Sequence, residues 1–168
     1  MAAERGRGVV QGERAPAGVP DPDPDEHIRF ARYRRALGPV APEDAADLVA
    51  RVLTDPDPAM ANSAVCEYLD RRAAELLTDP GYPAWCRELT GPVAVDGFTA
   101  RRLRERSLLR AIAVDEPWDA EELLAASTWL QPRVAEGSLA PAALAVLAGD
   151  GRTRRVRTIA GSRIPRPG

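Results

Sequence analysis

The chain has 168 residues and a formal net charge of −2, which fits a single domain. Apolar residues make up 45% of it, but 30 of them are alanine and only 35 are Ile, Leu, Val or Phe, so the core can only be small. No apolar stretch approaches the roughly 20 residues that cross a bilayer, and the first twenty residues lack the apolar segment of a secretory signal. We therefore expect a cytoplasmic protein.

The abundance of Ala, Leu, Arg and Glu favours helices over strands and predicts an all-α fold. Residues 1–25 are rich in Pro and Gly and include an alternating Pro-Asp run, so we expect an extended, mobile leader. A single helical domain is expected over residues 26–162, followed by a tail at 163–168. All 23 basic residues are arginine, which a GC-rich genome such as that of an actinobacterium would explain.

Apolar spacing and breaker residues predict the helices in chain order. In the first half, helices begin near residues 26, 42, 58 and 83, and the fourth is expected to stop before Gly91-Pro92. Residues 93–97 are the only β-like fragment and are too short for a sheet. Further helices are expected at about 98–114, 118–136, 139–148 and 152–160, with Pro132 as a kink or stop in the second of these. The result is a stack of seven or eight short antiparallel helices.

One tetrapeptide occurs twice, as Leu53-Thr54-Asp55-Pro56 and as Leu77-Thr78-Asp79-Pro80. In both copies the proline forbids continuation of the preceding helix, and chance or a shared turn type explains the recurrence as well as duplication does. The longer stretch 53–65 resembles the inter-helix turn and second helix of a HEAT-type repeat, with Met60-Ala61 where Val-Arg is usual. Residues 147–160 match the same repeat pattern more loosely and include the usual Val-Arg pair as Val156-Arg157.

The resemblance implies stacked helices whose surface binds another protein or, less often, nucleic acid. An irregular α bundle is the alternative fold, and it explains the same helix pattern. The resemblance to HEAT-type repeats covers about 40 residues of the chain.

The charge is distributed unevenly along the chain. Residues 98–110 carry net +4, residues 151–168 carry net +6, and the rest must therefore carry −12. We predict that arginines of both basic segments form a binding surface for an acidic protein or for phosphates. The candidate binding residues are Arg101, Arg102, Arg152, Arg154, Arg155 and Arg157.

Two other interpretations of these arginines stay open. They could pair with carboxylates of neighbouring helices, or form a solvated face. They could also bind nucleic acid, including through a recognition helix after Gly149-Asp150-Gly151, although Phe98 is the only aromatic residue in either segment. The three tryptophans, Trp85, Trp118 and Trp129, are expected to be core or inter-helix anchors rather than a ligand cage.

The sequence offers no catalytic or metal-binding constellation. The only histidine, His27, has no neighbouring ligand residue, and Cys66 and Cys86 are expected to be reduced, buried apolar groups. The acid pairs Glu43-Asp44, Asp115-Glu116 and Glu121-Glu122 are explained as helix starts. We therefore predict a non-enzymatic protein without metal or cofactor that binds another protein, with nucleic acid as the alternative partner. An enzyme that binds a small ligand between helices is a third possibility.

Overall fold

A computed structural model describes residues 25–94 and 97–164, and the described part is built from helices without strands, which confirms the all-α prediction. The leader up to residue 24, residues 95–96 of the β-like fragment and residues 165–168 of the tail lie outside the described residues. Nine helices are described: α1 (Glu26–Leu37), α2 (Pro42–Val52), α3 (Pro58–Glu75), α4 (Tyr82–Val93), α5 (Gly97–Ala113), α6 (Ala120–Ala125), α7 (Leu130–Gly137), α8 (Pro141–Asp150) and α9 (Arg154–Arg163).

Helices α1 and α3 begin where their sequences provide caps. The Asp25 carboxylate accepts hydrogen bonds from the backbone N–H groups of His27 and Ile28, and the Asp57 carboxylate accepts one from Met60. Pro58 occupies the first turn of α3, where a missing N–H costs nothing. Local sequence therefore decides where these helices start.

Two expected boundaries were wrong. Helix α4 continues through Gly91 and Pro92 to Val93, because a proline in the last turn disturbs only the end of the helix. The single helix expected at 118–136 is divided into α6 and α7. Pro132 lies in the first turn of α7, where backbone N–H groups have no intrahelical partner, so it is neither a kink nor a stop.

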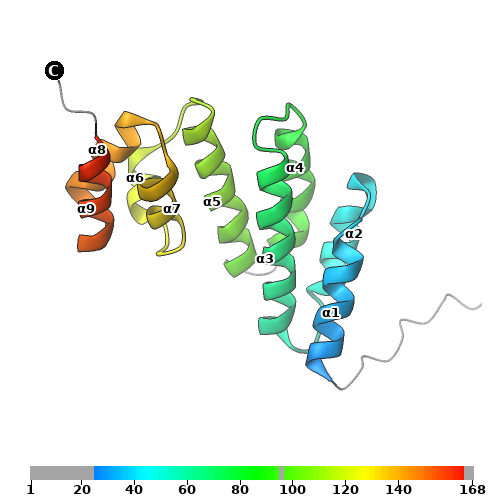
Figure 1. Cartoon of the computed structure of the whole chain (residues 1–168). Coiled ribbons are helices and arrows are strands. Elements are labelled where there is room, and N and C mark those ends of the chain that lie inside the picture. Colours follow the sequence, from blue (N-terminus) through cyan, green and yellow to red (C-terminus); the bar gives the residue numbers. More distant parts are fainter. Residues whose placement is uncertain (1–24, 95–96, 165–168) are drawn as a thin grey trace, which may run out of the picture.

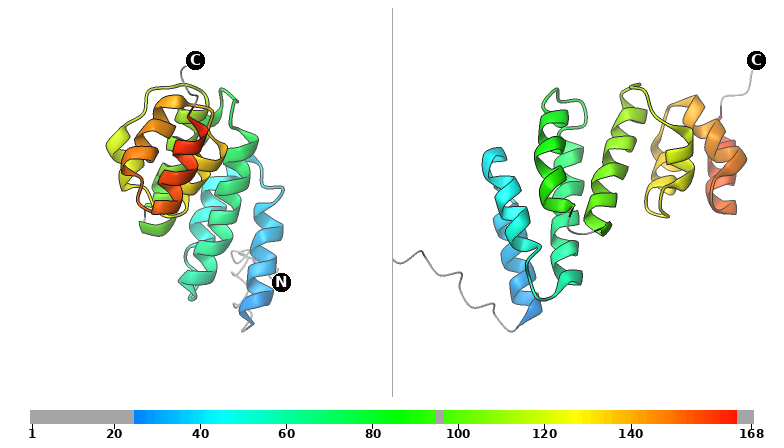
Figure 2. Two further views of the ribbon diagram at one scale, coloured as in Figure 1. Left: turned by 60° about the vertical axis from the view of Figure 1, so that its left-hand side comes forward. Right: turned by 180° about the vertical axis from the view of Figure 1, so that it is seen from behind.

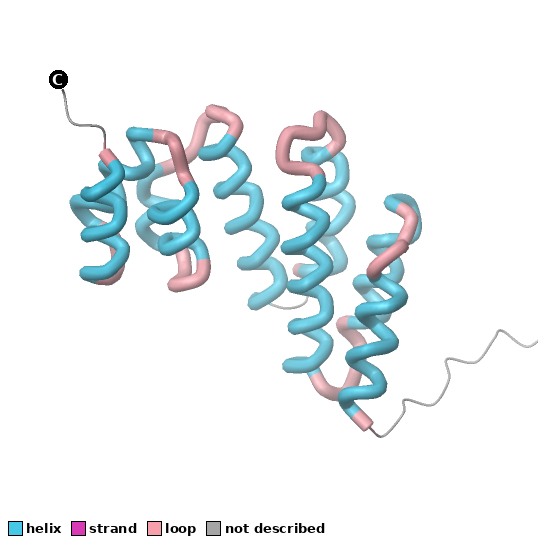
Figure 3. Tube along the Cα trace, viewed as in Figure 1, coloured by secondary structure: helices cyan, strands magenta, loops and turns pink. Residues whose placement is uncertain are grey.

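The helices are stacked in two layers. In the odd-numbered layer each of α1, α3, α5, α7 and α9 contacts the next, and in the even-numbered layer α2 contacts α4 and α6 contacts α8. Figure 1 shows the row from α1 to α9, and the right panel of Figure 2 shows it from behind, with α5 standing between α4 and α6. The even-numbered layer is thus interrupted over α5. Figure 3 shows the short turns that join successive helices.

Two hydrophobic cores lie along this stack and meet at α5. The first is formed by α1 to α4 and takes Leu103 from α5, whereas the second takes Leu108 and Ile112 and extends to α9. Since one helix contributes to both cores, α5 joins the two halves of the stack.

The repeated tetrapeptide has two different structural roles. Asp55 is buried and accepts hydrogen bonds from the Arg29 Nε at 3.2 Å, the Tyr33 hydroxyl at 2.7 Å and the Asp57 N–H at 2.9 Å. Burial raises the pKa of Asp55, but these hydrogen bonds and the Arg29 charge outweigh it, so the pKa is lowered overall. Asp79 is exposed and accepts a hydrogen bond from the Gly81 N–H. Only the first copy therefore fastens α1 to the turn between α2 and α3.

Candidate interaction surface

The two layers carry opposite formal charge. Within the helix bounds α1 carries +3, α3 −1, α5 +4, α7 zero and α9 +4, so the odd-numbered layer sums to +10. The corresponding values for α2, α4, α6 and α8 are −2, zero, −2 and −1, so the even-numbered layer sums to −5. A field of this kind favours an acidic partner on the odd-numbered side.

The two predicted residues on α5 face different surroundings, as expected for neighbours on a helix. Arg102 makes an ion pair of 2.7 Å with Asp70 of α3 and is 13% exposed. Arg101 is exposed and lines a recess that also includes Glu105 and Glu122. Arg101 and Arg104 of α5 therefore face the even-numbered side, beside the acidic α6, whereas Arg102 faces α3 in the odd-numbered layer.

The four predicted residues near the C-terminus lie at the end of the stack. Arg155 pairs with Glu136 of α7 at 3.2 Å, and Arg157 donates a hydrogen bond to the Gly151 carbonyl. The side chains of Arg152 and Arg154 are exposed. Helix α7 contacts both α5 and α9, so it lies between the two predicted arginine groups.

A cluster of arginines surrounds Trp129 between α3, α5 and α7. The guanidinium carbons of Arg102, Arg106 and Arg133 lie 4.0, 4.8 and 4.4 Å from the centroid of the indole ring. Asp70 accepts a hydrogen bond from Arg102 at 2.7 Å and one from Arg106 at 2.8 Å. Within residues 25–94 and 97–164, it is the only carboxylate within 4 Å of these guanidinium groups. These five residues are called the Trp129 cluster, and its formal charge is +2.

Glu105 determines where Trp129 is held. Its carboxylate is buried and accepts hydrogen bonds from the Ser127 backbone N–H at 2.7 Å and from the Ser127 hydroxyl at 3.0 Å. The same hydroxyl oxygen accepts a hydrogen bond from the backbone N–H of Trp129 at 3.1 Å. This chain of contacts ends α6, starts α7 and holds the indole against α5.

A groove between α1 and α3 extends the basic surface from the Trp129 cluster toward the N-terminal end. It has a volume of about 670 Å³ and is lined by Arg34, Arg35 and Arg71 together with Glu67 and Asp70. Arg34 pairs with Glu67 at 2.6 Å, and Arg71 donates a hydrogen bond to the Leu37 carbonyl. Asp70 lines this groove and belongs to the cluster, so the two features are continuous.

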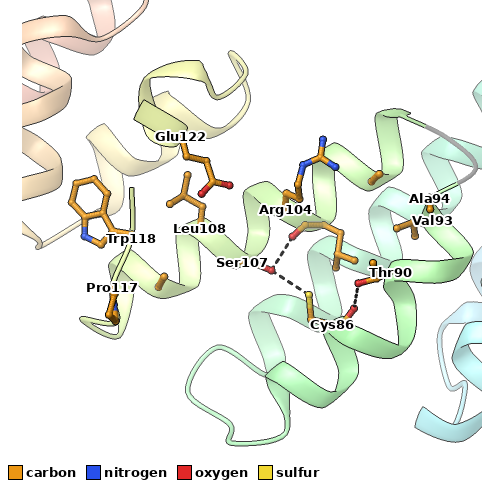
Figure 4. A pocket seen from close by; sticks show the side chains of 13 residues that line it. Cys86, Thr90, Val93, Ala94, Arg104, Ser107, Leu108, Pro117, Trp118 and Glu122 are labelled. Atoms are coloured by element: carbon orange, nitrogen blue, oxygen red, sulfur yellow. Dashed lines mark hydrogen bonds between the residues drawn. The ribbon is translucent and has the colours of Figure 1, made fainter. Parts of the chain in front are cut away.

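A cleft of about 490 Å³ lies on the opposite side, where the even-numbered layer is interrupted between α4 and α6 (Figure 4). Its walls are mainly apolar, and Arg104 and Glu122 contribute the charged groups. Ser107 lies within 3.3 Å of both the Cys86 sulfur and the Tyr82 hydroxyl. Burial raises the pKa of Tyr82.

The described lining of this cleft includes a thiol and a hydroxyl but no histidine. Neither cysteine is part of a disulfide, and Cys66 is buried as expected, whereas Cys86 is only half-buried and lines the cleft. The histidine that could activate a serine or thiol, His27, is exposed at the start of α1. In the described ranges no three His, Cys, Asp or Glu side chains are grouped to hold a metal ion.

Known proteins offer no guide to this surface. No family model, curated protein or solved structure matches the chain. The resemblance to HEAT-type repeats therefore stays a prediction. No described helix is both long and apolar enough to cross a membrane.

Sequence reasoning missed most of the Trp129 cluster. Trp129 was expected to be a core or inter-helix anchor, and it does pack half-buried against the second core, but its ring also contacts charged groups of α5 and α7, which was not expected. The available signal was a spacing of four residues between Arg102 and Arg106 and between Trp129 and Arg133, which places each pair on one face of a helix. Nothing in the sequence indicated that the two pairs would meet.

Proposed function

We propose that this chain is a non-enzymatic, cytoplasmic protein-interaction module of the helical-repeat type, and that its odd-numbered layer binds an acidic segment of a partner protein. The observation that carries the proposal is the separation of charge between the two sides of the stack: when Arg101 and Arg104 of α5 are counted on the even-numbered side that they face, +10 and −5 become +8 and −3. Such a separation orients an approaching acidic chain and speeds its association.

Arginines near both ends of the odd-numbered layer lie beside the neighbouring helix of that layer. Arg35 of α1 lines the groove shared with α3, and Arg155 of α9 pairs with Glu136 of α7. An acidic segment that follows the row of odd-numbered helices would therefore meet positive charge at both of its ends.

Nucleic acid is the competing partner for the same arginines. Sequence-tolerant binding of single strands uses aromatic rings on which bases stack. The Trp129 ring already has three guanidinium groups within 5 Å of its centroid, so it does not offer a free stacking surface. This contact favours an acidic protein segment.

Selection from a library of displayed random peptides tests the proposal. We expect the enriched peptides to be rich in Asp and Glu, and we expect them to lose binding to the variant R35E/R155E. Arg35 lines the groove between α1 and α3, and Arg155 lies on α9. The matched control is R51E/R87E, which reverses two exposed arginines of the even-numbered layer and changes the net charge equally.

Three outcomes would overturn the proposal. The enriched peptides could show no excess of acidic residues, or they could bind R35E/R155E as well as they bind R51E/R87E. The third is salt-sensitive binding of DNA or RNA without selection of any peptide, which would assign the surface to nucleic acid.

A further inference from the structure

An apolar pocket lies beside the Trp129 cluster, between α3, α5 and α7. Its volume is about 290 Å³, and Arg106 and Arg133 of the cluster are part of its lining. Leu77 and Leu109 are half-buried there, so they present apolar surface that the protein itself does not cover completely. The remaining lining residues are Ala74, Ile112, Ala113, Gly137 and Ser138.

The two arginines retain hydrogen-bonding capacity. A guanidinium group carries five N–H donors. Among the described residues, the Arg106 side chain gives one hydrogen bond to Asp70, and the Arg133 side chain gives one to the Trp129 carbonyl. Arg133 is exposed, and the cluster as a whole holds one carboxylate for three guanidinium groups. A second anion would reduce this excess of positive charge.

We propose that this pocket holds an aliphatic side chain of the acidic partner segment while Arg106 and Arg133 bind the carboxylate of an adjacent Asp or Glu. The inference rests on the proposed function, because it specifies the partner at the same surface. Apolar and cationic groups lining one pocket are suited to a ligand that presents both kinds of group side by side.

The apolar lining decides between a peptide and a simple polyanion. A polyanion gains from the guanidinium groups but leaves Leu77 and Leu109 in water. A Leu, Ile, Val or Met side chain beside the carboxylate removes that surface from water as well. Enriched peptides from the selection should therefore contain an acidic residue next to an aliphatic one, rather than acidic residues alone.

Two substitutions test the two halves of the pocket without disturbing the core. R133Q removes the charge of an exposed side chain whose described hydrogen bond is to a carbonyl of its own helix region. A113M places a larger side chain at an exposed position that lines the pocket. The matched controls are R87Q and A50M, at exposed positions of α4 and α2.

Each variant is measured against an enriched peptide and against two altered forms of it, one with the acidic residue changed to Gln and one with the aliphatic residue changed to Ala. We expect R133Q to raise the Kd of the original peptide roughly tenfold. The Kd of the Gln form should rise less than twofold, since this form already lacks the charge-assisted hydrogen bond. We expect A113M to raise the Kd of the original peptide roughly tenfold. The Kd of the Ala form should rise less than twofold, because this form has no aliphatic side chain to fill the pocket.

The results separate this inference from the proposed function. If the enriched peptides are acidic and depend on Arg35 and Arg155 but show no neighbouring aliphatic residue, the proposed function stands and the pocket assignment is wrong. Equal effects of R133Q on the original and Gln forms would also overturn it. Replacement of the acidic residue by phosphoserine is expected to change affinity less than tenfold, and a larger gain would reassign the site to a phosphoryl group.

Discussion

Glu105 accepts two hydrogen bonds from Ser127, one from its backbone N–H at 2.7 Å and one from its hydroxyl at 3.0 Å. The two residues are 22 positions apart, yet this contact divides the C-terminal half into α6 and α7 and holds Trp129 against α5. A buried carboxylate in α5 thus determines both a helix boundary and the geometry of the Trp129 cluster.

The variant E105Q is expected to lower the free energy of unfolding by about 1–3 kcal/mol, because a neutral amide accepts these bonds more weakly and brings two N–H donors of its own. Urea unfolding followed by tryptophan fluorescence measures the loss. E88Q serves as the control, since Glu88 is exposed on α4. Equal stability of E105Q and E88Q would contradict the assigned role of Glu105.

Acid should weaken the contact between α1 and the turn before α3. The pKa of Asp55 is lowered in the folded protein, so its charged form stabilises the fold above the ordinary value of about 3.9, and this contribution disappears as the pH falls through the lower, folded value. We expect D55N to be about 1–3 kcal/mol less stable than wild type at pH 7, with the difference shrinking on acidification. Urea unfolding at several pH values from 7 down to 2 measures it, and a difference that stays constant over this whole range would disprove the mechanism.

Two glycines near the end of α8 should respond in opposite ways to alanine. A Cβ atom at Gly151 would lie 2.5 Å from the Leu147 carbonyl oxygen and 2.9 Å from the Val156 side chain, whereas one at Gly149 would meet nothing within 4 Å. G151A should therefore lose about 1–3 kcal/mol of stability, and G149A should gain about 0.5–1 kcal/mol. Thermal unfolding compares them, and a stabilising G151A would show that α8 and α9 are not packed this closely.

The two thiols should react at different rates. Cys66 is 6% exposed, whereas Cys86 lines the cleft between α4 and α6. A thiol reagent is expected to modify Cys86 in the native protein and Cys66 only when the fold opens. Mass spectrometry after timed labelling distinguishes them. Faster modification of Cys66 would mean that α3 is more exposed than the structure shows.

Local signals in the sequence were sufficient for the fold class and for most helices. Caps such as Asp57 and breakers such as Pro58 act within a few residues, so they can be recognised without knowing the tertiary structure. The division of α6 from α7 depends on Glu105. The side chain of the buried Gln131 accepts a hydrogen bond from the Arg152 backbone N–H at 2.8 Å and donates hydrogen bonds to the carbonyls of Leu123 and Leu124. Contacts of this kind join distant segments and leave no local pattern.

The candidate surface was predictable only in part. The excess of arginine in two segments pointed to a basic surface, and Arg102 and Arg155 do lie in helices of the odd-numbered layer. The charge difference between the layers depends on which helices share a side, which follows from the stacking order. Trp129 and Arg133 join the surface because α7 packs between α5 and α9.

The most direct test of the charge-separated surface is the equilibrium Kd of one enriched acidic peptide for three proteins at fixed ionic strength: wild type, R35E/R155E and R51E/R87E. Both variants alter the net charge equally, so a difference between them reports the position of the charges rather than their number. We expect the Kd to rise at least roughly tenfold for R35E/R155E and less than threefold for R51E/R87E. Equal increases for the two variants would contradict the assignment of binding to the odd-numbered layer.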